Sequence, residues 1–173
     1  MNITLAEALP LKKQISKSLQ DKMRERNNNA FVEFEKDGDT VENPAKSFKD
    51  LTAELEEIRL DYRKMDFLMD QANINCKLDW EGQSISIKEA IEFSKQIRGE
   101  ASQLKSLSYS KPMEKVASYH REGPVTYKKA LFKPKELADE ALRLEKKANR
   151  LSMLIEKTNH LHEITFVEAD KYL

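Results

Sequence analysis

Apolar side chains recur at alternating steps of three and four residues over one long stretch of the chain. This stretch, called here the first seam, consists of Phe48, Leu51, Leu55, Ile58, Tyr62, Met65, Met69, Ala72 and Cys76. Such steps place successive side chains on one face of an α-helix and repeat every seven residues. The pattern predicts a helix over about 47–76 that is roughly 45 Å long at 1.5 Å per residue. A lone helix cannot bury that face, so the first seam requires a partner.

Three further helices are predicted, over about 4–26, 86–107 and 134–162. The first two begin with a hydroxyl residue followed three positions later by glutamate, which is the spacing of a capping box. The last contains a second seam, in which alanine alternates with larger residues, so a partner helix can approach closely. The second seam consists of Leu137, Ala141, Leu144, Ala148, Leu151, Ile155, Thr158 and His162. Because the linker 77–84 is short, the helices at 47–76 and 86–107 are predicted to be antiparallel neighbours.

The chain of 173 residues has only four glycines and five prolines. Few turns and long elements disfavour an all-β sandwich or a glycine-rich phosphate-binding α/β fold. The predicted class is mainly α, an antiparallel coiled coil or helical bundle of about four helices with a small two-stranded β element or arm. One helical domain is expected over 1–173.

Two segments do not read as long helix. Residues 30–42 form an acidic strand-turn arm, with a charge of −4 from Glu33 to Glu42. Residues 108–133 form a basic, strand-containing connection, with a charge of +6 from Lys105 to Lys135. These opposite charges predict that the strands of the two segments pair, with acidic side chains of 33–35 across from Lys128 or Lys129.

The composition also limits the function. Thirty basic residues balance thirty acidic ones, which argues against a general nucleic-acid-binding protein. No apolar run approaches the roughly 18 residues of a membrane-spanning helix, and no signal peptide is recognisable. Cys76 is the only cysteine, which excludes an intramolecular disulfide and a metal site built on several thiolates. A cytoplasmic protein is expected.

Self-association is predicted because the seams offer more apolar surface than pairing within one chain uses. Aromatic residues at segment ends or off the main stripes add to this surplus, and part of it is expected to meet another copy. They are Phe31, Phe34, Trp80, Phe93, Tyr127, Phe132, Phe166 and Tyr172.

The candidate binding residues lie in the basic connection, where lysines and tyrosines alternate. They are His120, Arg121, Tyr127, Lys128 and Lys129. Aromatic rings can stack on a ligand while cations neutralise an anion, so an anionic small molecule or a protein partner is expected here. The alternative is a lysine-rich strand edge that prevents sheet aggregation or meets the acidic arm.

No catalytic, cofactor or metal site is predicted. His160 and His162 are two apart, so on a helix they point about 200° apart and cannot easily share an ion. The carboxylates of helix 47–76, from Glu54 to Asp61, are interpreted as a solvated flank. Cys76 is interpreted as a small apolar residue, because no base for a catalytic thiol can be inferred.

Short motifs resemble the septicolysin-like family, a group of bacterial helical proteins. They are the opening Thr4–Leu9, the segment from Ala72 to Ile91 with its Gly82 turn, and Ile155–His160. The resemblance covers residues 3 to about 163. It implies a helical fold, and the family name implies a pore-forming toxin without established catalytic residues.

Three functional hypotheses follow. The first is a non-enzymatic, self-associating helical protein that acts as a scaffold or as a binding module for a small anion, nucleotide or protein partner. The second is a membrane-active toxin, as the resemblance implies. The third is an enzyme or nucleotide-binding protein whose site forms between subunits and uses Arg121, Tyr127 and Lys128.

Overall fold

The computed structural model describes residues 1–33, 44–116 and 125–173. The chain divides into two compact units, whereas the sequence predicted a single helical domain. Unit 1 comprises Met1–Cys76 and Thr158–Leu173, and unit 2 comprises Lys77–Lys157. The mainly α class is confirmed, since the described residues form four long helices and three two-stranded antiparallel sheets.

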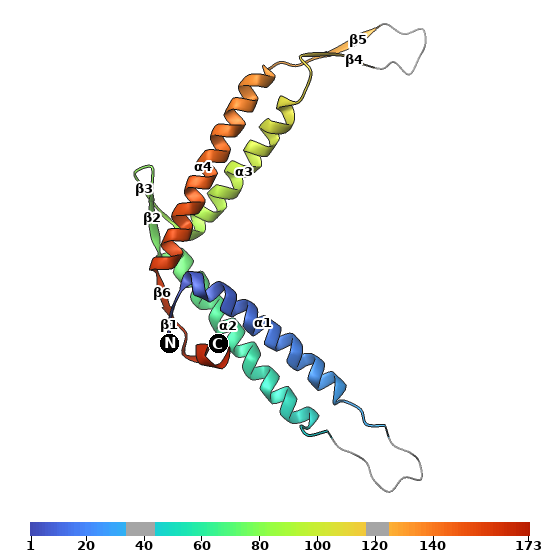
Figure 1. Cartoon of the computed structure of the whole chain (residues 1–173), viewed down its shortest axis with the longest axis vertical. Helices are drawn as coiled ribbons and strands as arrows, with labels where there is room; N and C mark the ends of the chain where they lie inside the picture. Colours follow the sequence, from blue (N-terminus) through green and yellow to red (C-terminus); the bar gives the residue numbers. More distant parts are fainter. Residues whose placement is uncertain (34–43, 117–124) are drawn as a thin grey trace. The chain divides into compact units, whose positions relative to one another are not determined.

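Unit 1 is built on two helices that run side by side, α1 (Leu5–Asn28) and α2 (Phe48–Asn75) (Figure 1). The first seam faces α1: Leu51, Leu55 and Met65 are completely buried, as is Ile15 of α1. The predicted helix and the inward orientation of its apolar stripe are therefore confirmed. Each fully buried side chain of this kind contributes roughly 1.5–3 kcal/mol. Packing of α1 against α2 therefore already buries much of the first seam.

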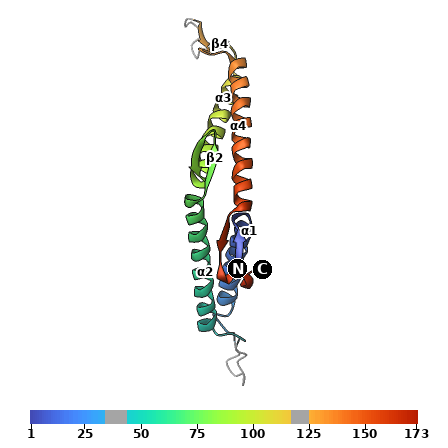
Figure 2. The ribbon, with the colours of Figure 1, turned by 90° about the vertical axis from the view of Figure 1, so that its left-hand side faces the viewer.

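The two ends of the chain meet in unit 1 (Figure 2). Strand β1 (Asn2–Thr4) pairs antiparallel with β6 (Glu163–Thr165), which is followed by the 3₁₀ helix η1 (Val167–Lys171). The Met1 ammonium donates to the Phe166 carbonyl at 3.0 Å, and the Phe166 N–H donates to the Met1 carbonyl at 3.0 Å. The Phe166 side chain is only 1% exposed. Phe166 is thus a core residue of unit 1 and not part of the surplus aromatic surface expected to meet another copy.

Asp61 departs from the predicted solvated flank of α2. Its side chain is buried and accepts hydrogen bonds from the Tyr172 hydroxyl at 2.8 Å and the Lys171 ammonium at 3.2 Å. The reason is that the C-terminal residues fold back over α2 and cover this position. Burial, followed by the contact with the Asp61 carboxylate, raises the pKa of the Tyr172 phenol, so Tyr172 stays neutral as a donor.

Unit 2 begins with a β-hairpin where a linker was predicted. Strands β2 (Lys77–Trp80) and β3 (Gln83–Ser86) pair antiparallel around Glu81 and Gly82, whose φ angles are 53° and 82°. Two positive φ angles are typical of the tight turns that suit twisted hairpins, and glycine adopts them without steric cost. The Asp79 carboxylate supports the turn by accepting from the Gly82 N–H at 3.1 Å.

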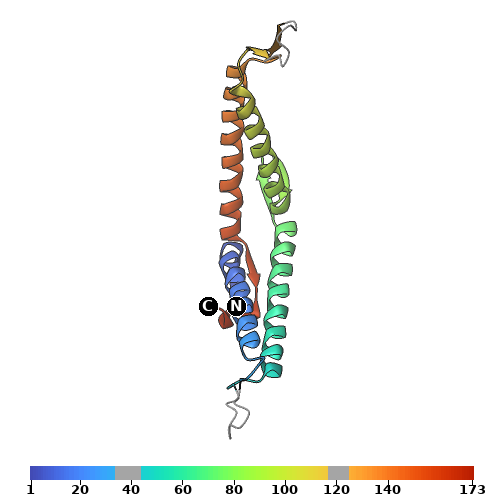
Figure 3. The ribbon, with the colours of Figure 1, turned by 90° about the vertical axis from the view of Figure 1, so that its right-hand side faces the viewer.

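Helices α3 (Ile87–Ser108) and α4 (Pro134–Leu161) lie side by side in unit 2 (Figure 3), with α4 entering unit 1 from Thr158. The Arg98 guanidinium donates to both Ser94 and Ser152 at 2.6 Å, which ties the two helices together. Ala148 of the second seam is fully buried. The prediction that helices 47–76 and 86–107 are antiparallel neighbours is wrong, because α2 pairs with α1 and α3 pairs with α4.

Both predicted capping boxes are present, at Thr4–Glu7 and Ser86–Glu89. In each, hydrogen bonds from the cap residue's backbone N–H and hydroxyl lower the pKa of the glutamate below its ordinary value of 4.5. A carboxyl with a lowered folded-state pKa stabilises the fold above its unfolded pKa. That contribution is lost as the pH falls through the folded pKa.

Acidification below pH 4.5 is therefore expected to remove the stabilisation from both capping boxes. The Glu7→Gln/Glu89→Gln variant should have a shallower loss of melting temperature than the wild type between pH 6 and pH 3, roughly the range over which such carboxyls titrate. Circular dichroism melts at a series of pH values measure this. Identical slopes for the two proteins would show that other carboxyls govern the acid response.

Candidate partner-binding site

A second β-hairpin lies between α3 and α4. Strand β4 (Met113–Val116) pairs antiparallel with β5 (Thr126–Lys129), and the ladder continues with the Ala130 N–H donating to the Pro112 carbonyl at 2.9 Å. Glu114 lies opposite Lys128. We call the described residues 107–116 and 125–132 the basic tip of unit 2.

Within the described residues, the predicted pairing between the acidic arm and the basic connection is not found. The strand expected near 125–132 exists, but its partner is β4, and residues 31–33 are not in a strand. The remainder of the acidic arm lies outside the described residues. Strands close in the sequence pair at a smaller entropic cost of loop closure than strands far apart. The short loop therefore favours β4 as the partner of β5.

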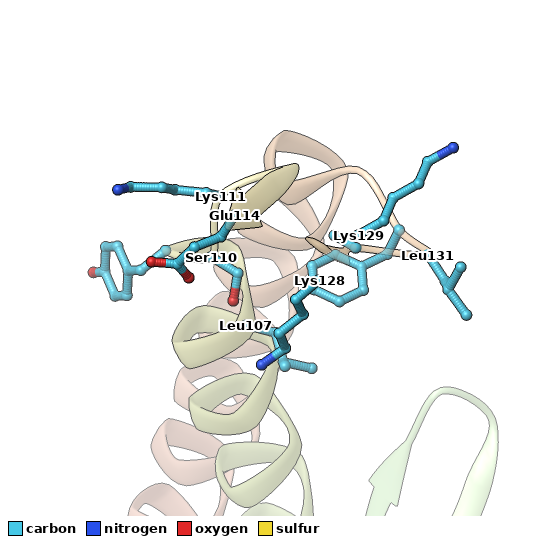
Figure 4. Close-up of a pocket in the computed structure, with 10 residues that line it drawn as sticks. Leu107, Ser110, Lys111, Glu114, Lys128, Lys129 and Leu131 are labelled. Carbon is cyan, nitrogen blue, oxygen red and sulfur yellow. The ribbon is translucent and has the colours of Figure 1, made fainter. Parts of the chain in front are cut away.

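A cavity of about 560 Å³ opens at the basic tip (Figure 4). Its lining mixes apolar and aromatic side chains with three lysines and one carboxylate. The lining residues are Leu107, Tyr109, Ser110, Lys111, Glu114, Lys128, Lys129, Ala130, Leu131 and Phe132. A hollow of this size with an apolar body and a few polar groups is typical of a binding site.

Apolar side chains are unusually exposed around this cavity. Leu131 is 96% exposed and Tyr109 is 77% exposed. Exposed apolar residues also follow the hairpin itself, namely Met113, Val116, Val125 and Tyr127. A single exposed leucine is ordinary, but an exposed apolar cluster on a soluble domain marks a contact surface.

The lysines of the cavity point in different directions. Figure 4 shows Lys111, Lys128 and Lys129 projecting their amines apart around the rim. Within the part of the chain that the structure describes, none of the three is in an ion pair. Amines so arranged do not close on one small anion, whereas an extended acidic chain can meet them in turn.

The structure unites only some of the predicted binding residues. Lys128 and Lys129 line the cavity, but Tyr127 is not among the lining residues and is 61% exposed. His120 and Arg121 lie outside the described residues. Sequence reasoning missed Leu107, Leu131 and Phe132 as binding residues. The available sequence signal for these binding residues was the apolar pair Leu131–Phe132, which lies between lysines just before the start of α4.

The other candidate sites give less support for a function than the cavity at the basic tip. In the described ranges, no three His, Cys, Asp or Glu side chains converge as metal ligands would. Glu54 of the α2 carboxylates is held in ion pairs with Lys22 at 2.8 Å and Lys46 at 2.5 Å. Partial burial raises the pKa of the Cys76 thiol and so disfavours the reactive thiolate.

No family model and no curated protein sequence matches the chain. Among solved structures, a conserved protein of unknown function from Corynebacterium diphtheriae has a similar fold. The TM-score is 0.62 with 18% sequence identity, over 95% of this chain and 100% of that one. At this identity the similarity shows a common fold. In the described part of the chain, no helix has the length and apolar character needed to cross a bilayer.

Proposed function

We propose that the protein is a cytoplasmic, non-enzymatic, self-associating helical protein whose basic tip binds an acidic segment of a partner protein. The observation that carries this proposal is the cavity at the basic tip, where apolar side chains such as Leu131 are exposed beside Lys111, Lys128 and Lys129. A ligand that satisfies both features combines carboxylates with at least one apolar side chain.

An extended peptide suits this surface better than a compact anion. The three amines are spread around the rim (Figure 4), so successive carboxylates of one chain can each find a cation. Among the described residues, β4 and β5 pair only with each other, so both outer edges of the hairpin offer backbone groups. An extended segment can add to such an edge as a third strand while an apolar side chain enters the cavity.

An array of labelled peptides with a constant number of glutamates and increasing leucine or phenylalanine content tests the proposal. Binding is expected to need both kinds of residue. The Lys128→Glu/Lys129→Glu variant should bind the best peptide about tenfold or more weakly, since each lost contact at about 1 kcal/mol and each new repulsion act in the same direction. The effect should shrink as salt is added.

The matched control is Lys88→Glu/Lys157→Glu, which makes the same charge change at exposed lysines outside the cavity. It should retain peptide binding. Equal weakening of peptide binding in both variants would mean that the interaction depends only on the net charge of the protein. An array in which no peptide binds, or in which apolar content makes no difference, would refute the partner site.

A second candidate function is attachment to an anionic membrane surface. The exposed Met113, Val116, Val125 and Tyr127 beside lysines could enter the interface of a bilayer, and the septicolysin-like resemblance also suggests membrane activity. Flotation and dye-release assays compare vesicles of neutral phosphatidylcholine with vesicles containing phosphatidylserine. Binding to the anionic vesicles without binding to any peptide would replace the partner proposal with this one.

A further inference from the structure

The acidic arm has the composition of a ligand for the basic tip. Its described start, Phe31, Val32 and Glu33, follows the end of α1, is exposed and lies in neither a helix nor a strand. Phe31 is 88% exposed, although phenylalanine is among the residue types most often buried. In the sequence Phe34 follows, and the stretch from Glu33 to Glu42 holds five acidic residues and one basic residue. The arm thus combines carboxylates with large apolar side chains in one short segment.

The basic tip has cations that no carboxylate neutralises. The lysines that flank the tip, Lys105 and Lys133, are paired with glutamates of α4 at 3.0 and 2.6 Å. By contrast, Lys111, Lys128 and Lys129 line the cavity and form no ion pair within the described ranges. The unpaired cations are therefore gathered where the apolar cavity opens, and a segment that carries both carboxylates and apolar side chains complements both features.

The carboxylates of α2 do not fit the tip in the same way. Glu54 is already paired with Lys22 and Lys46, and the buried Asp61 accepts hydrogen bonds from the C-terminal residues. Their backbone groups are also bonded within a helix, so this segment cannot add to the open edge of β4 or β5 as an extended strand. The start of the acidic arm has neither restriction.

We propose that the acidic arm of one copy of the chain docks at the basic tip of a second copy, with its apolar side chains in the cavity and its carboxylates against Lys111, Lys128 and Lys129. The proposal rests on the proposed function and names the segment that the tip binds. Each contact joins two unlike surfaces, so it leaves a free tip on one copy and a free arm on the other. Further copies are added until the assembly closes on itself.

Native mass spectrometry and light scattering over a range of concentrations measure the association of the full chain. The wild type is expected to associate. The arm variant, Glu33→Lys/Glu35→Lys, and the tip variant, Lys128→Glu/Lys129→Glu, should each weaken the association at least tenfold, because like charges then meet at the contact. A chain with all four substitutions reverses both charges and should associate again.

The matched control is Glu100→Lys/Glu156→Lys, which makes the charge change of the arm variant at two exposed glutamates of α3 and α4 outside the cavity. It should associate like the wild type. Because Glu33, Lys128 and Lys129 are exposed, the circular dichroism spectra of the arm and tip variants should match that of the wild type.

Mixing the two variants tests whether the contact joins separate copies. The tip variant keeps a native arm and the arm variant keeps a native tip, so the equimolar mixture should associate although neither variant does so alone. Isotope labelling of one variant identifies the mixed species by mass. A strictly monomeric wild type, a mixture that stays monomeric, or an arm variant that associates like the wild type would overturn the proposal.

A labelled peptide of residues 30–42 separates this inference from the proposed function. It should bind the wild type, bind the tip variant at least tenfold more weakly, and break up the wild-type assembly when added in excess. If designed peptides of the array bind at the tip but this peptide does not, the inference fails and the partner site stands. If no peptide with carboxylates and apolar residues binds, both fail.

Discussion

Replacing Phe166 with alanine is expected to lower the free energy of unfolding of unit 1 by about 3–5 kcal/mol. The side chain is 1% exposed and follows β6, whose Ile164 lies opposite Ile3 of β1. Its removal leaves a void that the neighbouring helices cannot fully close. The loss would weaken the attachment of the C-terminal segment to the helix pair, because the Phe166 backbone also exchanges two hydrogen bonds with Met1.

Hydrogen exchange of the α1 and α2 amides, together with urea denaturation, measures this change. Val167→Ala is the matched control, since it trims the adjacent residue at a position 73% exposed and should change the unfolding free energy by less than about 0.5 kcal/mol. If the two variants were equally stable, the buried position of Phe166 in unit 1 would be wrong.

The long helices were predictable because their signals are local and repeated. Thr4 with Glu7 and Ser86 with Glu89 mark two helix starts within one turn each, and both capping boxes form. The first seam places several apolar residues on one face, so a single error does not change the prediction. The helix expected over 47–76 is observed as Phe48–Asn75.

The contacts between distant segments were not predictable. β1 and β6 are three residues each and pair across almost the whole chain, and strands so short carry no periodic signal. Asp61 looked like an ordinary solvent-facing carboxylate, and only the fold of Lys171 and Tyr172 over α2 explains its burial. The choice of α1 as the partner of α2 was likewise not predicted, because the short segment 77–84 suggested the next helix as the partner.

The basic tip was predictable in charge but not in shape. The excess of lysines between Lys105 and Lys135 indicated an anionic ligand from the sequence alone. The cavity needs β4. Met113–Val116 alternates only weakly between apolar and polar residues, so it carries no strand signal in the sequence, and all four residues are exposed in the structure. The hairpin brings Glu114 and Lys128 together, and this pairing places Leu131 and Phe132 beside the lysines.

The other large expected effect is a loss of stability on truncating a side chain of the second seam. Leu151→Ala is expected to destabilise unit 2 by about 2–5 kcal/mol, since the Leu151 side chain is completely buried. Buried Ala148 lies one turn before it on the same face of α4, so the new void would open in a packed part of the molecule that cannot fully close around it.

Trp80 provides a specific probe, because it is the only tryptophan and belongs to unit 2. Urea titration followed by its fluorescence should give a lower midpoint for Leu151→Ala with an unchanged slope, which identifies a change of stability and not of compactness. Met153→Ala truncates another large apolar side chain of α4 at a position 69% exposed and should leave the midpoint close to that of the wild type. Equal midpoints for Leu151→Ala and the wild type would mean that the second seam does not face α3, and the heptad interpretation of α4 would fail.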